Sequence, residues 1–276
     1  MKLVMTLLVR DEQDIVGSNI SYHLEQGVDQ VIATDHGSTD ATTDILREYE
    51  RQGYLRYIHE ASEQYRQSEW VTRMARLAVT DHGADWVINN DADEFWWPKE
   101  GDLKSSLSRI PPQAGTVRVV RSNFRPRPGV TEWSAEAMTV RETRSLNVMD
   151  RPLPPKVCHR GVSDVKTGPG NHTVAGPGLD DRHEGSPILV FHFPMRTYEQ
   201  FERRIVDGAE AYLRTPNIAP NVGRGRRTLY GAYRAGLLRN HWDRYVMTES
   251  DVASGVASGS LIIDTRLARY FARHPL

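Results

Sequence analysis

The first 97 residues alternate between short strand-like runs and segments in which apolar residues recur at helical spacing. The strand-like runs are residues 3–9, 31–33, 54–58 and 86–88. The helical segments between them are residues 15–27, 41–53 and 69–83. Short apolar runs are typical of strands buried on both faces of a parallel sheet, and the intervening helices cover those faces. The pattern therefore predicts an α/β sandwich with a mostly parallel central sheet.

Charged clusters lie just after three of these four strands, at residues 10–12, 35–40 and 91–93. In open parallel sheets, ligands bind beyond the carboxyl ends of the strands. One polar strand end is ordinary, but three in one half of a chain predict a ligand site along this edge of the sheet.

The third cluster carries the clearest chemical signal. Asp91 and Asp93 are two residues apart, and on an extended backbone their side chains would point the same way. Hard carboxylate oxygens at a strand end suit Mg²⁺ or Mn²⁺, although such a triplet also occurs in ordinary acidic turns. Trp96 and Trp97 follow, and they either stack on a bound ligand or belong to the core.

Several classes of protein are disfavoured by the sequence. No G-x-G-x-x-G motif follows the first strand, and no P-loop motif is present. The formal net charge of −1 gives no reason to expect nucleic acid as a partner, and the single cysteine excludes an intrachain disulfide framework. The N-terminus becomes charged too early for a signal peptide, and no run reaches membrane-spanning length. We therefore expect a soluble, cytoplasmic protein without an integral membrane segment.

The ordered set of motifs resembles a family 2-like GT-A glycosyltransferase, from the branch whose metal motif reads Asp-x-Asp-Glu-Phe. The resemblance rests on residues 9–12, 35–40 and 85–95, and it continues more loosely through residues 156–160, 170–174 and 192–196. It implies a GT-A catalytic domain over residues 1–196, with a nucleotide-binding half at 1–97 and an acceptor half at 98–196. Residues 197–276 would form a helical extension packed on it.

The resemblance also implies roles for single residues. The backbone of Val9 and the side chains of Arg10 and Glu12 would line the pocket of the donor nucleotide. Asp35 would contact the base, Asp40 would shape the same loop, and Asp91 would lie near the ribose and sugar. Asp93 would be the main carboxylate on Mn²⁺ or Mg²⁺, with Asp91 nearby. A later histidine would complete the site: His192 is the first choice and His172 the second, unless they are structural residues of the core. His36 departs from the small or acidic residue usual in this loop.

The implied reaction moves a sugar from a nucleotide diphosphate to a hydroxyl of a glycan or small molecule. UDP is the favoured nucleotide, with GDP or dTDP as options, and inversion is favoured. Inversion requires a carboxylate base for the acceptor proton. The candidates in the second half are Asp164, Asp180, Asp181 and Glu184. We rank Asp181 first and Asp180 second because their turn precedes the last sheet strand, and Glu94 is the rival that would otherwise orient the metal loop.

Two other functions remain open at this stage: a nucleotidyltransferase, and a non-catalytic module that binds a nucleotide sugar or a glycan. The first would need a glycine-rich loop after the first strand, which residues 10–14 lack. In the second half of the chain we expect a loop at 123–129, a connection over the site at 141–155 and one helix at 224–240. Five arginines either clamp phosphate or lie on a solvated surface: Arg203, Arg204, Arg224, Arg226 and Arg227.

Overall fold

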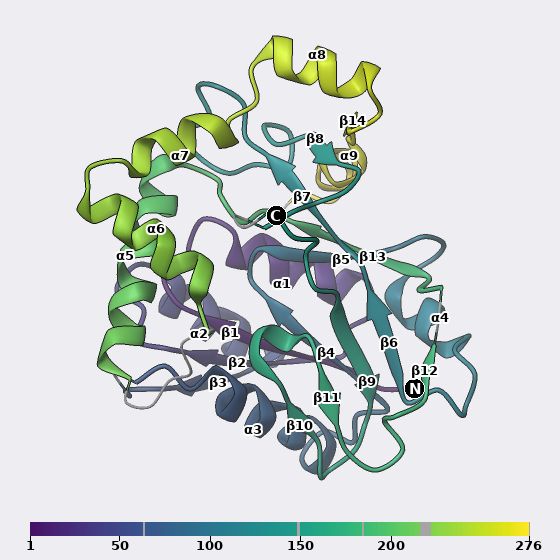
Figure 1. The fold of residues 1–276 in the computed structure, drawn as a ribbon. Coiled ribbons are helices and arrows are strands. Elements are labelled where there is room, and N and C mark those ends of the chain that lie inside the picture. The colour runs from purple at the N-terminus through teal and green to yellow at the C-terminus, as the bar shows by residue number, and fades with distance from the viewer. Residues whose placement is uncertain (63, 148–149, 184, 216–221, 276) are drawn as a thin grey trace. The chain divides into compact units, whose positions relative to one another are not determined.

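A computed structural model of the protein describes residues 1–62, 64–147, 150–183, 185–215 and 222–275 (Figure 1). Its contacts divide the chain into two compact units. The first comprises residues 1–62, 66–121 and 154–191, and the second comprises residues 63–65, 122–153 and 192–276. The domain boundary expected at residue 196 stays a prediction.

The first unit is built on a seven-stranded sheet with the order β12-β6-β9-β4-β1-β2-β3. Its strands are β1 (Leu3–Val9), β2 (Gln30–Asp35), β3 (Leu55–His59), β4 (Trp86–Asp91), β6 (Thr116–Val119), β9 (Lys156–Arg160) and β12 (Arg182–His183). All neighbours are parallel except at β9, which runs antiparallel to both β4 and β6. The predicted α/β class with a mostly parallel central sheet is confirmed.

Helices cover both faces of this sheet because right-handed crossovers connect its parallel strands. Helices α1 (Val16–Glu25) and α2 (Thr42–Arg51) lie on one face, and α3 (Gln67–Thr80) lies on the other (Figure 1). The apolar stripe of α3, with Val71 and Met74, packs against Val4, Ile32 and Val87 of the strands. These side chains are buried, so the hydrophobic effect holds the strand ends in register.

The remaining elements of the first unit follow the central strands. A turn at residues 92–93 leads into β5 (Glu94–Pro98), and α4 (Leu103–Ser108) begins at Asp102 with a capping box. Strand β13 (Ile188–His192) neighbours β5, and the Lys99 N–H donates to the Pro187 carbonyl, 2.8 Å away. A small hairpin joins β10 (Lys166–Thr167) to β11 (Val174–Ala175) across the 3₁₀ turn η1 (Pro169–Asn171).

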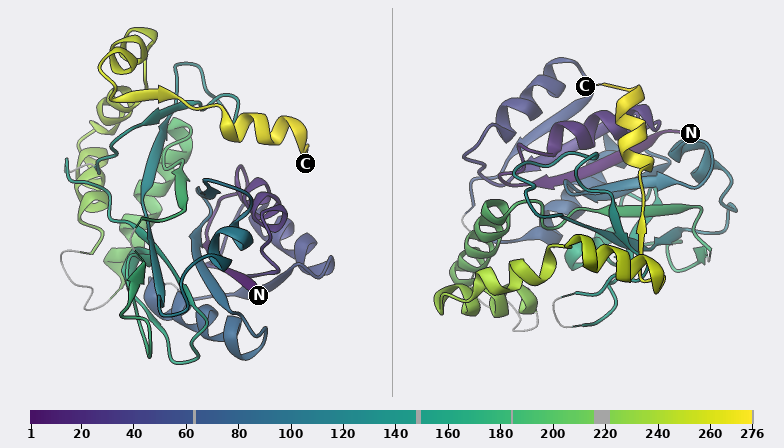
Figure 2. Two further views of the ribbon diagram at one scale, coloured as in Figure 1. Left: turned by 90° about the vertical axis from the view of Figure 1, so that its right-hand side faces the viewer. Right: turned by 90° about the horizontal axis from the view of Figure 1, so that it is seen from above.

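The second unit combines three antiparallel strands with five helices among its described residues. Its strand order is β14-β8-β7, formed by β14 (Leu261–Ile263), β8 (Val140–Glu142) and all but the first residue of β7 (Arg121–Arg125). The helices are α5 (Tyr198–Arg214), α6 (Arg224–Arg234), α7 (Leu238–Tyr245), α8 (Glu249–Ala257) and α9 (Arg266–Arg273). Helices α5 and α6 lie side by side (Figure 2). Phe201, Ile205, Leu229, Leu238 and Trp242 form the core between α5, α6 and α7.

Two local predictions are wrong. Residues 123–125 belong to β7 rather than to a loop, because Phe124 is buried and pairs with Arg141 of β8. Residues 224–240 do not form one helix: α6 ends before Gly236, whose φ of 72° lies in the left-handed region, and α7 starts afterwards. Within the described ranges, no helix is both long and apolar enough to cross a membrane.

Candidate active site

The three polar strand ends meet at one edge of the first unit's sheet. The register pairs Val9 with Asp35 and Leu8 with Asp91, so β1, β2 and β4 end at the same level. The expectation that these ends lie together is therefore confirmed. Strand β9 starts at this edge because it runs antiparallel to β4, and its first residue is Lys156.

Asp35 organises the loop that follows β2. Its Oδ1 accepts hydrogen bonds from the Ser38 N–H (2.9 Å) and the Ser38 hydroxyl (2.6 Å). Its Oδ2 accepts from the hydroxyls of Thr43 (2.6 Å) and Tyr57 (3.1 Å). A carboxylate offers about four acceptor positions, and these donors fill them. The base contact expected of Asp35 would require one of these donors to be displaced.

Hydrogen bonds join the loop after β1 to the loop after β2. Asp11, with a φ of 53°, accepts from the Thr39 N–H at 2.7 Å. The Glu12 N–H donates to the Thr42 hydroxyl at 2.9 Å. The two oxygens of Asp40 accept from the N–H groups of Thr42 and Gln13, at 2.9 and 3.2 Å. Asp40 therefore helps to join the two loops.

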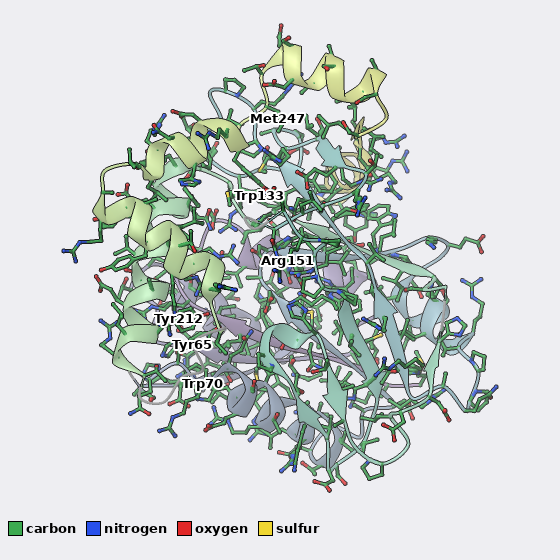
Figure 3. All side chains as sticks on the ribbon, in the orientation of Figure 1. Tyr65, Trp70, Trp133, Arg151, Tyr212 and Met247 are labelled. Carbon is green, nitrogen blue, oxygen red and sulfur yellow. The ribbon has the colours of Figure 1, made fainter. Side chains whose placement is uncertain are left out.

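The other residues named for the nucleotide lie beside these loops. The Val9 carbonyl accepts from the His36 N–H at 2.9 Å. Arg10 follows β1, and its Nε lies 3.6 Å from Asp11 Oδ2, with its side chain 35% exposed. The His36 ring packs on Trp70, with centroids 4.5 Å apart. Trp70 lies on α3 (Figure 3). Burial and the positive charge of Arg10 lower the pKa of His36, so the ring is neutral near pH 7.

Polar residues of α1 hold the acidic turn between β4 and β5. The Asn19 amide donates to the carbonyls of Ala92 (2.9 Å) and Glu94 (2.7 Å), and it accepts from the Asn90 amide at 2.9 Å. All of these side chains are buried. We had expected the side chains of Asp91 and Asp93 to point the same way, as on an extended strand. The chain instead turns at residues 92–93, so the alternation of a strand does not apply to this pair.

Trp96 belongs to the core. Its side chain is fully buried, and its indole N–H donates to Asn90 Oδ1 at 2.9 Å. Its backbone N–H donates to His23 Nε2 at 3.2 Å, while His23 Nδ1 lies 2.7 Å from the Asn19 carbonyl. Burial lowers the pKa of His23 to about 4, which keeps the ring neutral. Trp97 is half-buried and stacks on Phe191, with centroids 5.3 Å apart.

Asp91 binds two neighbouring side chains. Its Oδ2 accepts from the Lys156 ammonium, and its Oδ1 accepts from the Asn171 amide at 3.2 Å. Asn171 has a φ of 61°, a conformation that asparagine tolerates better than most residues, and this turn presents its amide to the site. Asp91 is 29% exposed, whereas Asp93 is buried at 2%.

Lys156 also neutralises Glu94. Both side chains are fully buried, and Lys156 Nζ lies 3.1 Å from Glu94 Oε2. Arg121 Nη1 lies 3.0 Å from the other oxygen of Glu94. Glu94 therefore sits between two cations. Whether Glu94 acts as the base or orients a metal loop stays a prediction.

His172 packs between Pro155 and Gly170, and its role as a metal ligand stays a prediction. Its Nδ1 lies 3.0 Å from the Pro155 carbonyl, and Gly170 lies directly against its Nε2, since a Cβ on Gly170 would be only 2.5 Å from that nitrogen. Burial and the positive charges of Lys156 and Arg121 lower the pKa of His172 to about 4.

The structure does not bring Asp180 and Asp181 to the site. The N–H groups of Gly115 and Thr116 donate to the Asp181 carbonyl, and β12 pairs with β6 at Arg182 and Thr116. Thr116 pairs with His159 of β9, and His159 pairs with Val87 near the start of β4. Asp91 lies at the other end of β4. Both aspartates are exposed at the opposite end of the sheet. This is a correction to their expected role as base, and Glu184 lies outside the described residues.

His192 belongs to the second unit. Its Nδ1 lies 2.7 Å from Asn123 Oδ1, and the residue is 7% exposed. It is the last residue of β13, and the other four residues of that strand belong to the first unit. Its role as a metal ligand stays a proposal.

Sequence reasoning missed four residues that shape this site: Asn19, Arg121, Lys156 and Asn171. A signal existed for two of them. Lys156 opens the run Lys-Val-Cys-His, where a charge in a buried strand needs a partner, and Asn19 interrupts the apolar stripe of α1. Asn171 lies in the run 170–174 of the looser resemblance, which gave it no role of its own. Arg121 carried no comparable signal because its contact with Glu94 joins segments far apart in the chain.

Three comparisons relate this chain to known proteins. Residues 7–114, less than half of the chain, match the model of Glycosyltransferase family 92. A comparison with curated proteins finds no match. The family match supports glycosyl transfer, although the matched family differs from the family 2-like group that the motifs resemble.

Solved structures of glycosyltransferases match parts of this chain with TM-scores below 0.5. Staphylococcus aureus TarS (residues 1–349) has a TM-score of 0.46 and 12% identity, over 75% of this chain and 65% of that one. The mannosyltransferase PcManGT from Pyrobaculum calidifontis, in complex with GDP-Man and Mn²⁺, has a TM-score of 0.34 and 19% identity, over 44% and 35%. Glucosyl-3-phosphoglycerate synthase from Mycobacterium tuberculosis, in complex with Mn²⁺, UDP and its product, has a TM-score of 0.32 and 20% identity, over 44% of each chain. This chain spans less than two thirds of each structure.

Proposed function

We propose that this protein transfers a sugar from a nucleotide diphosphate to a hydroxyl acceptor. The observation that carries the proposal is the convergence of three polar strand ends at one sheet edge, with Val9 level with Asp35 and Leu8 level with Asp91. The family match covers the same part of the chain. In the reaction, the acceptor oxygen bonds to the anomeric carbon, the bond from that carbon to the diphosphate breaks, and a base takes the acceptor proton.

The donor nucleotide would lie against the two loops that Asp11, Asp35 and Asp40 hold together. The proposed contacts are the Val9 backbone and the side chains of Arg10 and Glu12. Arg10 is partly exposed beside Asp11, so its guanidinium is available to a phosphate or a base. Asp35 and Asp40 would act by keeping the loop in shape, since loop donors occupy their oxygens. UDP is the nucleotide that we favour, with GDP and dTDP as the options.

The residues of the acidic turn fit a divalent cation. Asp91 and Glu94 both contact the Lys156 ammonium, Glu94 also contacts Arg121, and Asp93 adds a third carboxylate in the turn between them. Each oxygen of Asp91 accepts one hydrogen bond and retains capacity for a water of a hydrated ion. Asp93 would be the direct ligand for Mn²⁺ or Mg²⁺. When bound, such an ion would supply the Lewis acid that neutralises the leaving diphosphate.

His192 is our proposed second ligand. Residues 188–191 of β13 lie beside β5 and run towards its first residue, Glu94, because Lys99 at the far end of β5 bonds to Pro187. His192 follows these residues directly. A neutral imidazole is a suitable ligand for Mn²⁺ alongside carboxylates.

One observation favours a second function, a nucleotide-sugar-binding module that does not use a metal. The Lys156 ammonium occupies an oxygen of Asp91, the first carboxylate of the motif, and a tethered cation at this place reduces the need for an ion. In that case nucleotide binding would not depend on a divalent cation.

Thermal unfolding with UDP, GDP and dTDP, each with and without Mn²⁺, tests both functions. We expect one nucleotide to raise the unfolding temperature by several degrees, and only when Mn²⁺ is present, because ligand binding to the folded state alone stabilises it. An equal shift without the metal would favour the binding module. The absence of a shift with any nucleotide under any metal would contradict the glycosyltransferase proposal.

A further inference from the structure

The turn between α6 and α7 is exposed over nearly its whole length. From residue 233 to residue 241, every residue is exposed except Leu238. This stretch comprises the end of α6, the left-handed Gly236 and the first half of α7, and we call it the α6–α7 tip. The loops that we propose for the nucleotide belong to the first unit, so that function does not account for the tip.

The α6–α7 tip is fixed by the core beneath it. Leu238 is 2% exposed, and Trp242, one helical turn further along α7, is also buried. Both side chains pack in the cluster that contains Phe201 and Leu229, where α5, α6 and α7 meet. Because the interior of a protein is closely packed, these contacts hold the neighbouring side chains of the tip in solvent.

Two large apolar side chains of the α6–α7 tip are exposed. Leu237 is 50% exposed, although its neighbour Leu238 fills a core position. Tyr233 is 36% exposed, and its ring stacks on that of Tyr230, with centroids 6.0 Å apart. A single exposed hydrophobic residue needs no explanation. A leucine and a tyrosine on one well-packed turn form a surface that can enter the boundary of a bilayer, where tyrosine is enriched.

The charge around the α6–α7 tip is positive and largely unneutralised. Residues 222–247 contain six arginines and one acidic residue, Asp243, although the whole chain has a net charge of −1. Asp243 pairs with Arg239, so these two charges cancel within α7. Three exposed arginines make no ion pair with any residue in the described ranges: Arg224, Arg234 and Arg244.

The acidic residues of the neighbouring helices have other partners or form no ion pair with these arginines. On α5, Glu210 pairs with Arg214, and Glu202 accepts from the Tyr198 hydroxyl at 2.6 Å. On α8, the Asp251 carboxylate caps its own helix. Two of the unpaired arginines stand close to the exposed Leu237 in sequence, because Arg234 belongs to the tip and Arg244 lies three residues beyond it.

Exposed apolar side chains beside unpaired arginines match a bilayer that contains anionic phospholipids. Arginines are attracted to such a surface, and apolar side chains enter the boundary between its headgroups and acyl chains. We propose that the α6–α7 tip binds an anionic membrane surface. Leu237 and Tyr233 enter the boundary, and the guanidinium groups of Arg234 and Arg244 bind headgroup phosphates. A nucleic acid would match the arginines but not the exposed leucine. The proposal does not depend on glycosyl transfer.

The experiment is co-sedimentation of the full chain with two kinds of vesicle: phosphatidylcholine alone, and equal parts of phosphatidylcholine and phosphatidylglycerol. The chain should bind the anionic vesicles at least about tenfold more tightly, because the arginines are attracted only to an anionic surface. Added salt should weaken this binding, since it screens exposed charges. Equal binding to both kinds of vesicle, or no binding to the anionic ones, would overturn the proposal.

Arg234→Gln, Arg244→Gln and Leu237→Ser should each weaken binding to the anionic vesicles by about fivefold. Arg118→Gln is the matched control for the arginines, because Arg118 is exposed on β6 of the first unit and has no ion pair within the described residues. Val120→Ser is the control for Leu237, since Val120 is 63% exposed in the first unit. Unchanged vesicle affinity in the Arg234→Gln, Leu237→Ser double variant would overturn the proposal. A DNA duplex that binds as tightly as the anionic vesicles, with equal affinity for the Leu237→Ser variant, would assign the arginines to nucleic acid and also overturn it.

Discussion

Lys156 and Glu94 are both fully buried, and the Lys156 ammonium lies 3.1 Å from a Glu94 oxygen while it also binds Asp91. The two strands that carry Lys156 and Asp91 run antiparallel, so the start of one meets the end of the other. A buried ammonium is tolerated only where carboxylates surround it. The ion pairs of Lys156 therefore contribute to the stability of the first unit and also lower the negative charge of its candidate metal site.

Lys156→Met should destabilise the protein by about 3 kcal/mol, because it leaves Glu94 buried with only Arg121 as a cationic partner. Urea unfolding followed by circular dichroism measures this change. The matched control is Lys104→Met, which removes the half-exposed Lys104–Asp29 pair and should cost less than about 1 kcal/mol. Equal losses of unfolding free energy in the two variants would show that burial does not increase the contribution of the Lys156 ion pairs to stability.

Asp93→Asn should abolish Mn²⁺-dependent nucleotide binding and leave the unfolding temperature of the free protein within a few degrees of the parent. The substitution keeps the shape of the side chain and removes the charge that we propose as the direct metal ligand. Nucleotide titrations with and without Mn²⁺ provide the measurement. Asp81→Asn, at an exposed position after α3, is the control. If the Asp93 variant keeps its Mn²⁺-dependent affinity for nucleotide, Asp93 is not the metal ligand.

Asp35→Asn should destabilise the protein by about 1–3 kcal/mol and weaken nucleotide binding. The new amide would point a donor at the hydroxyls of Ser38, Thr43 or Tyr57, so at least one hydrogen bond of the loop would be lost. Urea unfolding and nucleotide titration measure the two effects. Asp44→Asn, at an exposed position in the first turn of α2, should change stability by less than about 1 kcal/mol. A stability equal to that of the parent would mean that the loop does not depend on Asp35.

His23 should make the protein less stable in acid. Burial lowers its folded pKa from 6.5 to about 4, so the unfolded state binds a proton first as the pH falls. The contribution of neutral His23 to stability is complete above pH 6.5. As the pH falls from 6.5 to 4, the free energy of unfolding decreases by about 1.4 kcal/mol per pH unit. Urea unfolding from pH 7 to 4.5 should show a shallower dependence in His23→Gln. Parallel curves for variant and parent would contradict the assignment.

The sequence anticipated the frame of the first unit and the edge that carries its site. The runs at 3–9, 31–33, 54–58 and 86–88 all became strands, because short apolar runs have few alternatives to a buried sheet position. The prediction was weaker in the second half of the chain. There, Asn123 and Arg125 looked like loop residues, but pairing with β8 and the ion pair of Arg125 with Glu142 stabilise a strand.

The sequence by itself determined which residues stand at the strand ends, because hydrophobic periodicity is local and the chain order of strands and helices follows from it. Only the tertiary structure decided which side chains those residues meet. Lys156 reaches Asp91 across 65 positions of sequence, and Asn19 holds the turn at Ala92 from 73 positions away. The strand pairing also moved Asp181 to the opposite end of the sheet. Such contacts depend on strand order and register, which arise from the packing of the whole unit rather than from any local run of residues.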